Sequence, residues 1–553
     1  MVTMNNDVLK IIPLGGAGEV NRNMYVYEFG DYQIAVDCGV GFPKEESLGV
    51  DVVIPDIAYL EESRKMGKKL LGIILTHGHM DHIGGLPYIL PRLPEVSVYG
   101  ASLALALSKG KLEEYGIKNP LKVVAEKLKL GPFDMEFLHV THSMPDCKHI
   151  VIRTPAGVVY HGADFKFDLT PLDNKPADLI GMARAGSHGV DLLLSDCLRV
   201  ESPGMTPSEK TLLEAIENEV RRTKGRFVFT TMSSSISRMQ MAINAAVKYG
   251  RRVVLIGRSI EQNIMAAEKL GFVSIPKNSL VKSNRIRGIK PSNLCFITAG
   301  SLGQEGSAMH KIAAGEHRFV NVGKGDRVVI SADAIPGYER SVSNLIDGLL
   351  LCGADVTYSK TSDNLHVSGH GHRQDMALLA RLIKPNYLVP IGGDLKHMVA
   401  YRKLALEMGY SEEKIKILGG GQTLVMNHGK VTKGENVESK NVYVDGLGIG
   451  DVGKVVLQDR KTMAGDGMLI VIIPTKKGSH QVSGEIEIIS RGFVYVKEAE
   501  DLMDEIKKQI VKSLGGNIEN WGLARKRVES DLEKFVYKIT ERNPMIISAI
   551  IEV

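Results

Sequence analysis

The stretch Thr76–Gly85, with the sequence THGHMDHIGG, decides the fold class, and it follows directly on the apolar run LLGIIL at Leu70–Leu75. Three histidines and one aspartate fall within six residues on a loop that leaves a predicted buried strand. Imidazole and carboxylate groups at this spacing are ligands suited to zinc or manganese. A solvated, histidine-rich turn is the competing interpretation, but the chain has only 16 histidines in 553 residues. The candidate ligands are His77, His79, Asp81 and His82.

The length and composition describe a multidomain globular protein. A chain of 553 residues exceeds what one hydrophobic core organises, so two to four domains are expected. The net charge of +5 is small for this length, so any nucleic-acid binding must come from local clusters of Lys and Arg. The five cysteines include no C-x-x-C pair, which argues against a disulfide framework and a cysteine-ligated zinc.

The first residues and the apolar runs bear on location. The N-terminal stretch MVTMNNDVLKIIPLGG lacks the basic segment and apolar run of a signal peptide, and apolar runs elsewhere are only as long as strands. The sequence therefore predicts a cytoplasmic protein that does not enter a membrane.

The rhythm of apolar runs divides the chain into domains. Short runs that end in polar residues recur to about residue 205, which predicts sheets packed on each other with helices outside. From Thr206 amphipathic helices alternate with buried strands, which predicts a parallel sheet. The strand Tyr387–Ile391 then indicates a return to the first domain. The predicted boundaries are 1–205 and 363–435 for the first domain, 206–362 for an inserted domain, and 436–553 for a linker and a small α+β domain whose expected role is assembly.

The motif H-x-H-x-D-H at His77–His82 resembles the signature of the metallo-β-lactamase fold, an αββα sandwich. This resemblance implies that His77 and His79 bind one ion, and Asp81 and His82 a second. His142, in THSMPD, resembles the third ligand of the first ion. Asp164, in HGADFKFD, resembles the carboxylate that bridges the two ions. The cofactors implied are two divalent ions per subunit, Zn²⁺ or Mn²⁺.

The insertion and the segment HVSGHG at 366–371 resemble the β-CASP subgroup, which acts on nucleic acids. The resemblance gives Asp196 and His370 a joint role in protonating the leaving oxygen. The chemistry of phosphodiester hydrolysis adds Asp81 as a residue expected to orient the attacking hydroxide. More specifically, almost the whole chain resembles the ribonuclease J family. The segments that carry it are PLGGAGEVNRNMYVYE, SPGMTPSE, GRSIEQN, IPGYE, VYVDGLGIGDVG and ISRGFVYV.

Ribonuclease J reads the 5′-monophosphate of RNA, and two departures from the family pattern concern its chemistry here. Relatives have Asn and His where this chain has Ser235 and Ser237, which leaves a plain serine loop as the alternative. Relatives have a histidine that completes the second metal's shell where this chain has Gly392, so Asp394, His397 or water remain as substitutes and the second site is expected to be weaker. The resemblance places the phosphate pocket on Ser234 within the run 233–235, Arg258, Ser368, Gly369 and His370.

The sequence thus supports two functional hypotheses. The first is a metal-dependent ribonuclease for RNA processing and decay, a 5′-to-3′ exonuclease with endonuclease activity on single-stranded RNA, assembled as a homodimer or homotetramer. The second is a catalytically weak, RNA-binding paralogue that supports an active partner subunit, which the loss of histidine at position 392 motivates. A nuclease of the same fold acting on DNA, or another phosphoesterase, also remains open.

Overall fold

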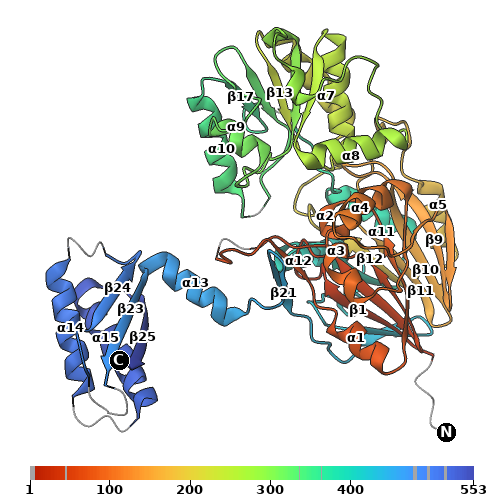
Figure 1. The fold of residues 1–553 in the computed structure, drawn as a ribbon. Coiled ribbons are helices and arrows are strands. Elements are labelled where there is room, and N and C mark those ends of the chain that lie inside the picture. Colours follow the sequence, from red (N-terminus) through yellow and green to blue (C-terminus); the bar gives the residue numbers. More distant parts are fainter. Residues whose placement is uncertain are drawn as a thin grey trace, which may run out of the picture. The chain divides into compact units, whose positions relative to one another are not determined.

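The computed structural model describes residues 7–43, 46–335, 337–362, 364–476, 482–494, 499–515 and 520–552. The chain forms two compact units, one made of Met1–Phe42 with Val52–Val442 and the other of Pro43–Asp51 with Tyr443–Val553 (Figure 1). Among the described residues, no helix combines the length and apolar character needed to cross a bilayer.

The first unit contains two large sheets. The eight-stranded sheet has the order β20 (Lys430–Lys433), β19 (Leu424–Asn427), β1 (Leu9–Gly15), β2 (Met24–Phe29), β3 (Tyr32–Val36), β5 (Lys69–Leu75), β6 (Val98–Gly100) and β7 (Leu121–Val123). The six-stranded sheet has the order β18 (Tyr387–Ile391), β12 (Leu192–Asp196), β11 (Gly157–Gly162), β10 (Cys147–Thr154), β9 (Phe133–Val140) and β8 (Lys127–Leu130).

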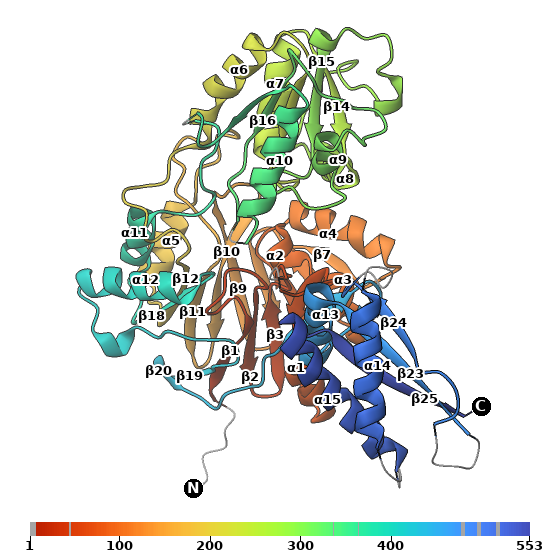
Figure 2. The ribbon, with the colours of Figure 1, turned by 90° about the vertical axis from the view of Figure 1, so that its left-hand side faces the viewer.

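The two sheets face each other across one hydrophobic core. Tyr27 and Ile34 from the first sheet are fully buried in it, together with Phe133 and Ile150 from the second. Helices α1 and α4 pack on strands of the first sheet, and α11 and α12 pack on β12 and β18 of the second (Figure 2). This is the αββα sandwich. The helices of this part are α1 (Ala58–Lys65), α2 (Met80–Ile83), α3 (Leu86–Ile89), α4 (Ser102–Glu114), α5 (Leu179–Ser187), α11 (Arg373–Ile383) and α12 (Leu395–Glu407).

The inserted segment forms a five-stranded sheet in which every neighbouring pair is parallel. The parallel sheet expected after Thr206 is therefore confirmed. Its order is β14 (Arg252–Ile256), β15 (Leu294–Thr298), β13 (Phe227–Thr230), β16 (Arg327–Ile330) and β17 (Asp355–Tyr358). Its helices are α6 (Leu212–Arg222), α7 (Ile236–Lys248), α8 (Arg258–Lys269), α9 (Ala308–Ala313) and α10 (Glu339–Leu351), after the 3₁₀ turn η2 (Glu209–Thr211).

Asp375 fastens both ends of the insertion to the sandwich. Its fully buried carboxylate accepts hydrogen bonds from the backbone N–H of Phe167 at 2.8 Å, of Thr206 at 2.8 Å and of His372 at 3.0 Å. Phe167 follows β11, Thr206 begins the insertion and His372 lies where the chain returns. One side chain thus holds three segments that are far apart in sequence but meet beside the ends of the strands.

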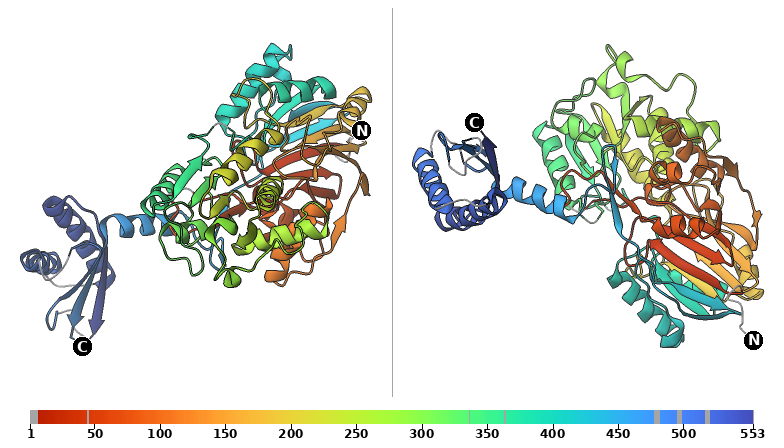
Figure 3. Two further views of the ribbon diagram at one scale, coloured as in Figure 1. Left: turned by 90° about the horizontal axis from the view of Figure 1, so that it is seen from above. Right: turned by 60° about the horizontal axis from the view of Figure 1, so that its bottom comes forward.

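The second unit has its own core. Strand β23 (Met468–Thr475) pairs antiparallel with β24 (Glu487–Arg491) and parallel with β25 (Met545–Glu552). Helices α14 (Glu500–Leu514) and α15 (Trp521–Thr540) pack on this sheet through buried residues such as Ile506 and Leu532 (Figure 3). The small α+β domain expected at the C-terminus is present.

Several details differ from the sequence-based expectations. Strand β10, helix α13 (Lys454–Asp466) and strands β4 (Val52–Pro55) and β22 (Gly448–Ile449) were not predicted; β22 pairs with β21 (Asn441–Asp445). The sequence also predicts a strand over 484–496 and a helix from 497; the strand is shorter within the described residues, and the start of the helix lies outside them. Pro43–Asp51 joins the second unit because the N–H of Asp51 donates to the carbonyl of Val444 at 2.9 Å.

Candidate metal centre

The candidate ligands leave the ends of strands from both sheets at the same edge of the sandwich. The loop after β5 continues directly into α2, and other site residues follow β9 and β11 or end β12. Because β5, β11, β12 and β18 end at this edge, polar side chains from distant parts of the chain meet there. The residues concerned are His77, His79, Asp81, His82, His142, Asp164 and Asp196, with Gly392 following β18.

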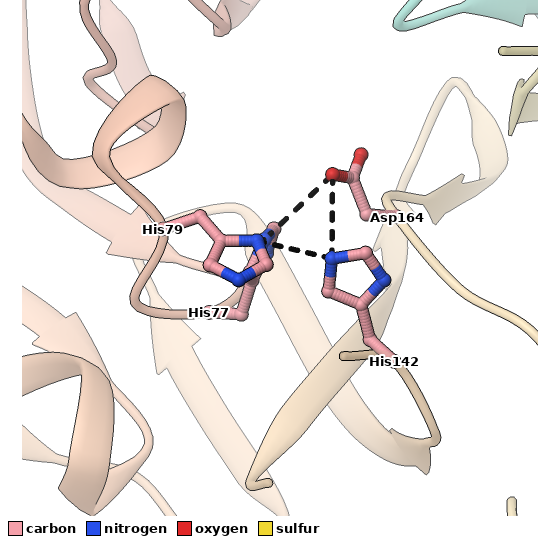
Figure 4. Close-up of side chains that lie close together, drawn as sticks. All are labelled: His77, His79, His142 and Asp164. Carbon is pink, nitrogen blue, oxygen red and sulfur yellow. Dashed lines mark hydrogen bonds and ion pairs between the residues drawn. The ribbon is translucent and has the colours of Figure 1, made fainter. Parts of the chain in front are cut away.

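Three imidazoles and one carboxylate converge in the first cluster (Figure 4). His79 Nδ1 lies 3.1 Å from His77 Nε2 and 3.0 Å from His142 Nε2. The carboxylate of Asp164 lies 3.7 Å from His77 Nε2 and 3.8 Å from His142 Nε2. Burial, followed by the neighbouring imidazoles, holds the pKa of His77 and of His142 well below the usual value. The imidazoles are therefore neutral, as metal ligands must be.

Hydrogen bonds on the far side of the rings fix which nitrogens carry hydrogen. His142 Nδ1 donates to the carbonyl of Gly369 at 2.6 Å, because a carbonyl can only accept. The hydroxyl of Thr76 donates to Asp37, so His77 Nδ1 must donate to that hydroxyl at 3.1 Å. The Nε2 atoms of His77 and His142 therefore carry no hydrogen, and each presents a lone pair. His79 Nδ1 can give a hydrogen to at most one of them, so a cation fits this cluster better than any hydrogen-bond arrangement.

The second cluster contains Asp81, His82 and the shared carboxylate of Asp164. His82 Nε2 lies 3.3 Å from Asp164 Oδ2 and 3.7 Å from Asp81 Oδ2. Burial alone would lower the pKa of His82, but the carboxylates of Asp164, Asp37 and Asp81 raise it well above the usual value. The three carboxylates thus stabilise positive charge at this point, and a divalent ion would supply that charge in place of a protonated His82.

Asp37 is a supporting residue that the sequence interpretation missed. Its buried carboxylate accepts from His82 Nδ1 at 2.7 Å and from the backbone N–H and hydroxyl of Thr76, each at 2.8 Å. Carboxylates that orient metal-binding imidazoles in this way are common around metal centres. The available signal was an aspartate directly after β3, the strand that neighbours β5 in the sheet.

A third cluster joins Asp196, His370 and Asp164. His370 Nδ1 lies 2.7 Å from Asp196 Oδ2, while its Nε2 lies 3.7 Å from Asp164 Oδ2. Burial would lower the pKa of His370, but Asp196 and Asp164 raise it to about 9. The ring of His370 also packs edge-on against that of His142, with centroids 5.0 Å apart. The two residues assigned to proton transfer therefore contact each other and adjoin the candidate ligands.

A cavity of about 420 Å³ adjoins these clusters. Of the expected phosphate-binding residues, Ser368, Gly369 and His370 line it, and so does Ser235. Ser234 instead lines a separate hollow near α4 and α8, and Arg258, the first residue of α8, lines neither. The structure therefore places Ser234 and Arg258 outside the cavity to which the resemblance assigned them. Of the serine run before α7, only Ser235 lines this cavity.

Three cationic side chains, Arg199, Arg238 and Lys396, line the same cavity and were not singled out from the sequence. Arg238 lies on α7, three residues after Ser235, and is almost fully buried. A guanidinium that is buried beside a polar cavity can favour an anion there. The helical spacing from Ser235 could have indicated this residue.

Gly392 faces the clusters without contributing a side chain. A Cβ built at this position would lie 3.8 Å from Asp196 Oδ1 and 3.9 Å from Asp164 Oδ1, so a side chain would point into the site. The backbone there has a φ of 65°, which residues other than glycine adopt only with strain. Asp394 and His397 cap the start of α12, and neither belongs to a ligand cluster of the described residues. Neither Asp394 nor His397 therefore takes the place of the missing histidine ligand in this arrangement.

Comparisons with known proteins cover nearly the whole chain. The metallo-beta-lactamase superfamily matches residues 17–203, and the beta-CASP domain of ribonuclease J matches 224–349. A Zn-dependent metallo-hydrolase RNA specificity domain matches 358–418, and the ribonuclease J C-terminal domain matches 455–553.

Relatives of known name agree with these matches. Ribonuclease J2 of Bacillus subtilis is 37% identical over all of both chains. Ribonuclease J 1 of Streptococcus pyogenes is 35% identical over 100% of this chain and 99% of its own, and ribonuclease J of Thermus thermophilus is 37% identical over 99% and 96%. A crystal structure of a protein of unknown function from Enterococcus faecalis shares the fold, with a TM-score of 0.51 at 16% identity over 77% of this chain and 100% of its own. The chain belongs to the ribonuclease J family of metal-dependent RNA nucleases.

Proposed function

We propose that this protein is a 5′-to-3′ exoribonuclease that also cuts RNA internally, and that it acts in RNA processing and decay. The observation that carries the proposal is the meeting of three ring nitrogens, Asp164 and the His370–Asp196 pair at one edge of the sandwich. Such a site has the groups needed to bind cations and to supply a proton beside them.

The ligand sets would bind two metal ions. His77, His79 and His142 would hold the first, Asp81 and His82 the second, and Asp164 both. Two bound divalent cations would activate a water molecule, polarise the scissile phosphate and neutralise its charge. Zn²⁺ suits the imidazole-rich first set, while the oxygen-rich second set also suits Mn²⁺.

His370 has the position and charge of a general acid. Its Nδ1 is held by Asp196, which leaves Nε2 directed toward the candidate centre. A proton on Nε2 would pass to the departing sugar oxygen, and Asp196 would stabilise the ring in the correct orientation. Asp81, at the edge of the second cluster, would orient the attacking hydroxide.

The 5′-end preference follows from the cavity beside His370. Ser368, Gly369 and Ser235 offer hydroxyl and amide donors there, and Arg238 adds positive charge. Donors of these kinds bind phosphate oxygens well. We assign this cavity to the 5′-terminal monophosphate of single-stranded RNA.

A weakly active paralogue subunit is the second candidate, and Gly392 is the observation that favours it. The second cluster has three ligand residues, one of which it shares, whereas the first has four. The retained ligands argue for activity, because a subunit relieved of catalysis has no physical need for four oriented imidazoles. Assembly as a homodimer or homotetramer and a cytoplasmic location stay predictions.

The first prediction concerns the ligands. His79→Ala or Asp81→Ala should reduce cleavage of 5′-labelled RNA by more than about a hundredfold, the scale expected for groups that act on the transition state. Both side chains extend from strand ends, so circular dichroism should stay close to that of the natural protein. His188→Ala, an exposed histidine at the end of α5, is the matched control. Near-normal turnover in either ligand variant would contradict the assignment.

The second prediction concerns the 5′ end. The natural protein should degrade RNA with a 5′-monophosphate faster than RNA with a 5′-triphosphate, because the cavity must accommodate one phosphate rather than three. Ser368→Val should lower exonucleolytic decay by about ten- to a hundredfold, the value of a lost charged hydrogen bond. Cleavage of circular RNA, which has no ends, should fall less. Equal decay of both end types by the natural protein would refute the pocket.

The third prediction concerns Gly392. After dialysis, metal analysis by mass spectrometry should find one ion per chain retained and the other lost. Gly392→His should retain both, because a directly bound imidazole is worth at least the roughly 10–100-fold in affinity that outer partners contribute, whereas the strain of positive φ is the same with and without the ion. Gly392→Ala carries the same strain without a ligand and should behave like the natural protein. Two tightly held ions in the natural protein would show that glycine does not weaken the second site.

A further inference from the structure

The segment Val367–His370 is held by an unusual set of hydrogen bonds. Each of its four successive backbone carbonyls accepts from a side chain of another segment, with distances of 3.1 Å at Ser368, 2.6 Å at Gly369 and 2.9 Å at His370. The orientation of every peptide unit in this segment is therefore fixed from outside it. The donors are, in chain order of the carbonyls, Arg238, Lys166, His142 and Thr206.

These carbonyl contacts determine where the opposite N–H groups point. In a planar trans peptide the C=O of one residue and the N–H of the next point in opposite directions. Arg238 at the carbonyl of Val367 therefore orients the N–H of Ser368, and Lys166 at the carbonyl of Ser368 orients the N–H of Gly369. Neither N–H has a hydrogen-bond acceptor among the described residues, and both residues line the cavity. Successive free N–H groups of this kind form a concave site for an anion.

Lys166, Arg238 and Glu209 form one buried network behind this segment. Their side chains are 0%, 3% and 5% exposed. Glu209 accepts from Lys166 at 3.1 Å and from Arg238 at 3.0 and 3.1 Å. Burial alone would raise the pKa of Glu209, but the two cations lower it to about 2, so the carboxylate is ionised.

The network therefore carries two positive charges and one negative charge. It draws one residue from the loop after β11, one from η2 and one from α7, so it also joins the sandwich to the insertion. An excess positive charge in a buried place is expensive unless an anion lies nearby. The cavity in front of the segment is lined by three cations, Arg199, Arg238 and Lys396, and by two carboxylates, Glu201 and Asp333, so its lining also favours an anion.

We propose that Lys166, Glu209 and Arg238 are positioning residues for the 5′-terminal phosphate of RNA. They orient the N–H groups of Ser368 and Gly369 into the cavity and supply the unbalanced positive charge that favours a phosphate there. Glu209 keeps the two cations together so that each reaches its own carbonyl. This inference rests on the proposed function, because it deepens the assignment of the cavity to the 5′ end.

The test measures binding rather than turnover. Two dinucleotides with a hydrolysis-resistant phosphorothioate linkage, one with a 5′-monophosphate and one with a 5′-hydroxyl, are titrated calorimetrically into the metal-loaded full-length protein. Lys166→Met removes the ammonium and leaves Glu209 paired with Arg238, so no lone charge is buried. It should weaken binding of the 5′-phosphorylated dinucleotide about tenfold or more, as for a lost charged hydrogen bond, and leave the 5′-hydroxyl form unchanged.

Two further variants make the result decisive. Lys210→Met removes an exposed lysine next to Glu209 and should leave both affinities unchanged. Arg238→Lys keeps the charge beside Glu209 but cannot reach Glu209 and the carbonyls of Ser331 and Val367 together, and it should show the same selective loss even if Lys166→Met fails to fold.

Equal weakening of both dinucleotides, or no weakening in a folded variant, would overturn the positioning role. If the natural protein itself binds both dinucleotides equally, the 5′-end assignment fails with it. Selective binding by the natural protein that both variants retain would instead overturn only the network's role.

Discussion

The arrangement of the whole site depends on hydrogen bonds that fix the histidine rings from outside the centre. His142 is held by the carbonyl of Gly369, His77 by Thr76 and His82 by Asp37, so each ring presents its other nitrogen inward. Without those partners, neutral imidazoles could rotate or exchange tautomers and would not converge as lone pairs. The sandwich supplies these partners because loops from both sheets meet at one edge. Metal affinity in this protein is thus a property of the surrounding backbone as much as of the ligands.

The insertion contributes to the same centre through the segment that follows it. Gly369 holds a candidate metal ligand, its neighbour Ser368 lines the cavity, and its other neighbour, His370, is paired with Asp196. Asp375 and the buried network at Glu209 anchor this segment to both the sandwich and the insertion. For the proposed exonuclease, these rigid contacts would keep the cavity at a fixed distance from the cleaved bond, as an enzyme that removes nucleotides from an end requires.

Much of this could be predicted from the sequence, for identifiable physical reasons. The histidine motif could be read as a ligand set from its own residues, whereas His142, Asp164, Asp196 and His370 came from the family resemblance, and the structure brings all of them together. The parallel sheet of the insertion also followed from its helix and strand rhythm.

The supporting residues could not be predicted in this way. Lys166 and Glu209 act through contacts between segments far apart in sequence, and nothing in their local pattern distinguishes them from surface charges. Asp37 has only its place after a strand as a signal, and its contact with His82 depends on the fold. Arg258 was predicted and Arg238 was not, because a family resemblance identifies motifs, whereas the direction of a side chain depends on the turn before a helix. Helix α13 was missed because its exposed, weakly patterned residues lack an apolar stripe.

The most direct test of this account is a crystal of the full-length protein grown with Zn²⁺ and measured by anomalous diffraction at the zinc edge. The account predicts one strong peak about 2.0–2.1 Å from Nε2 of His77, Nδ1 of His79 and Nε2 of His142, as zinc–imidazole bonds require. It also predicts a weaker peak between Asp81 and His82, with Asp164 bound to both ions. A zinc peak elsewhere, or three imidazoles that hydrogen-bond one another around an empty centre, would contradict it.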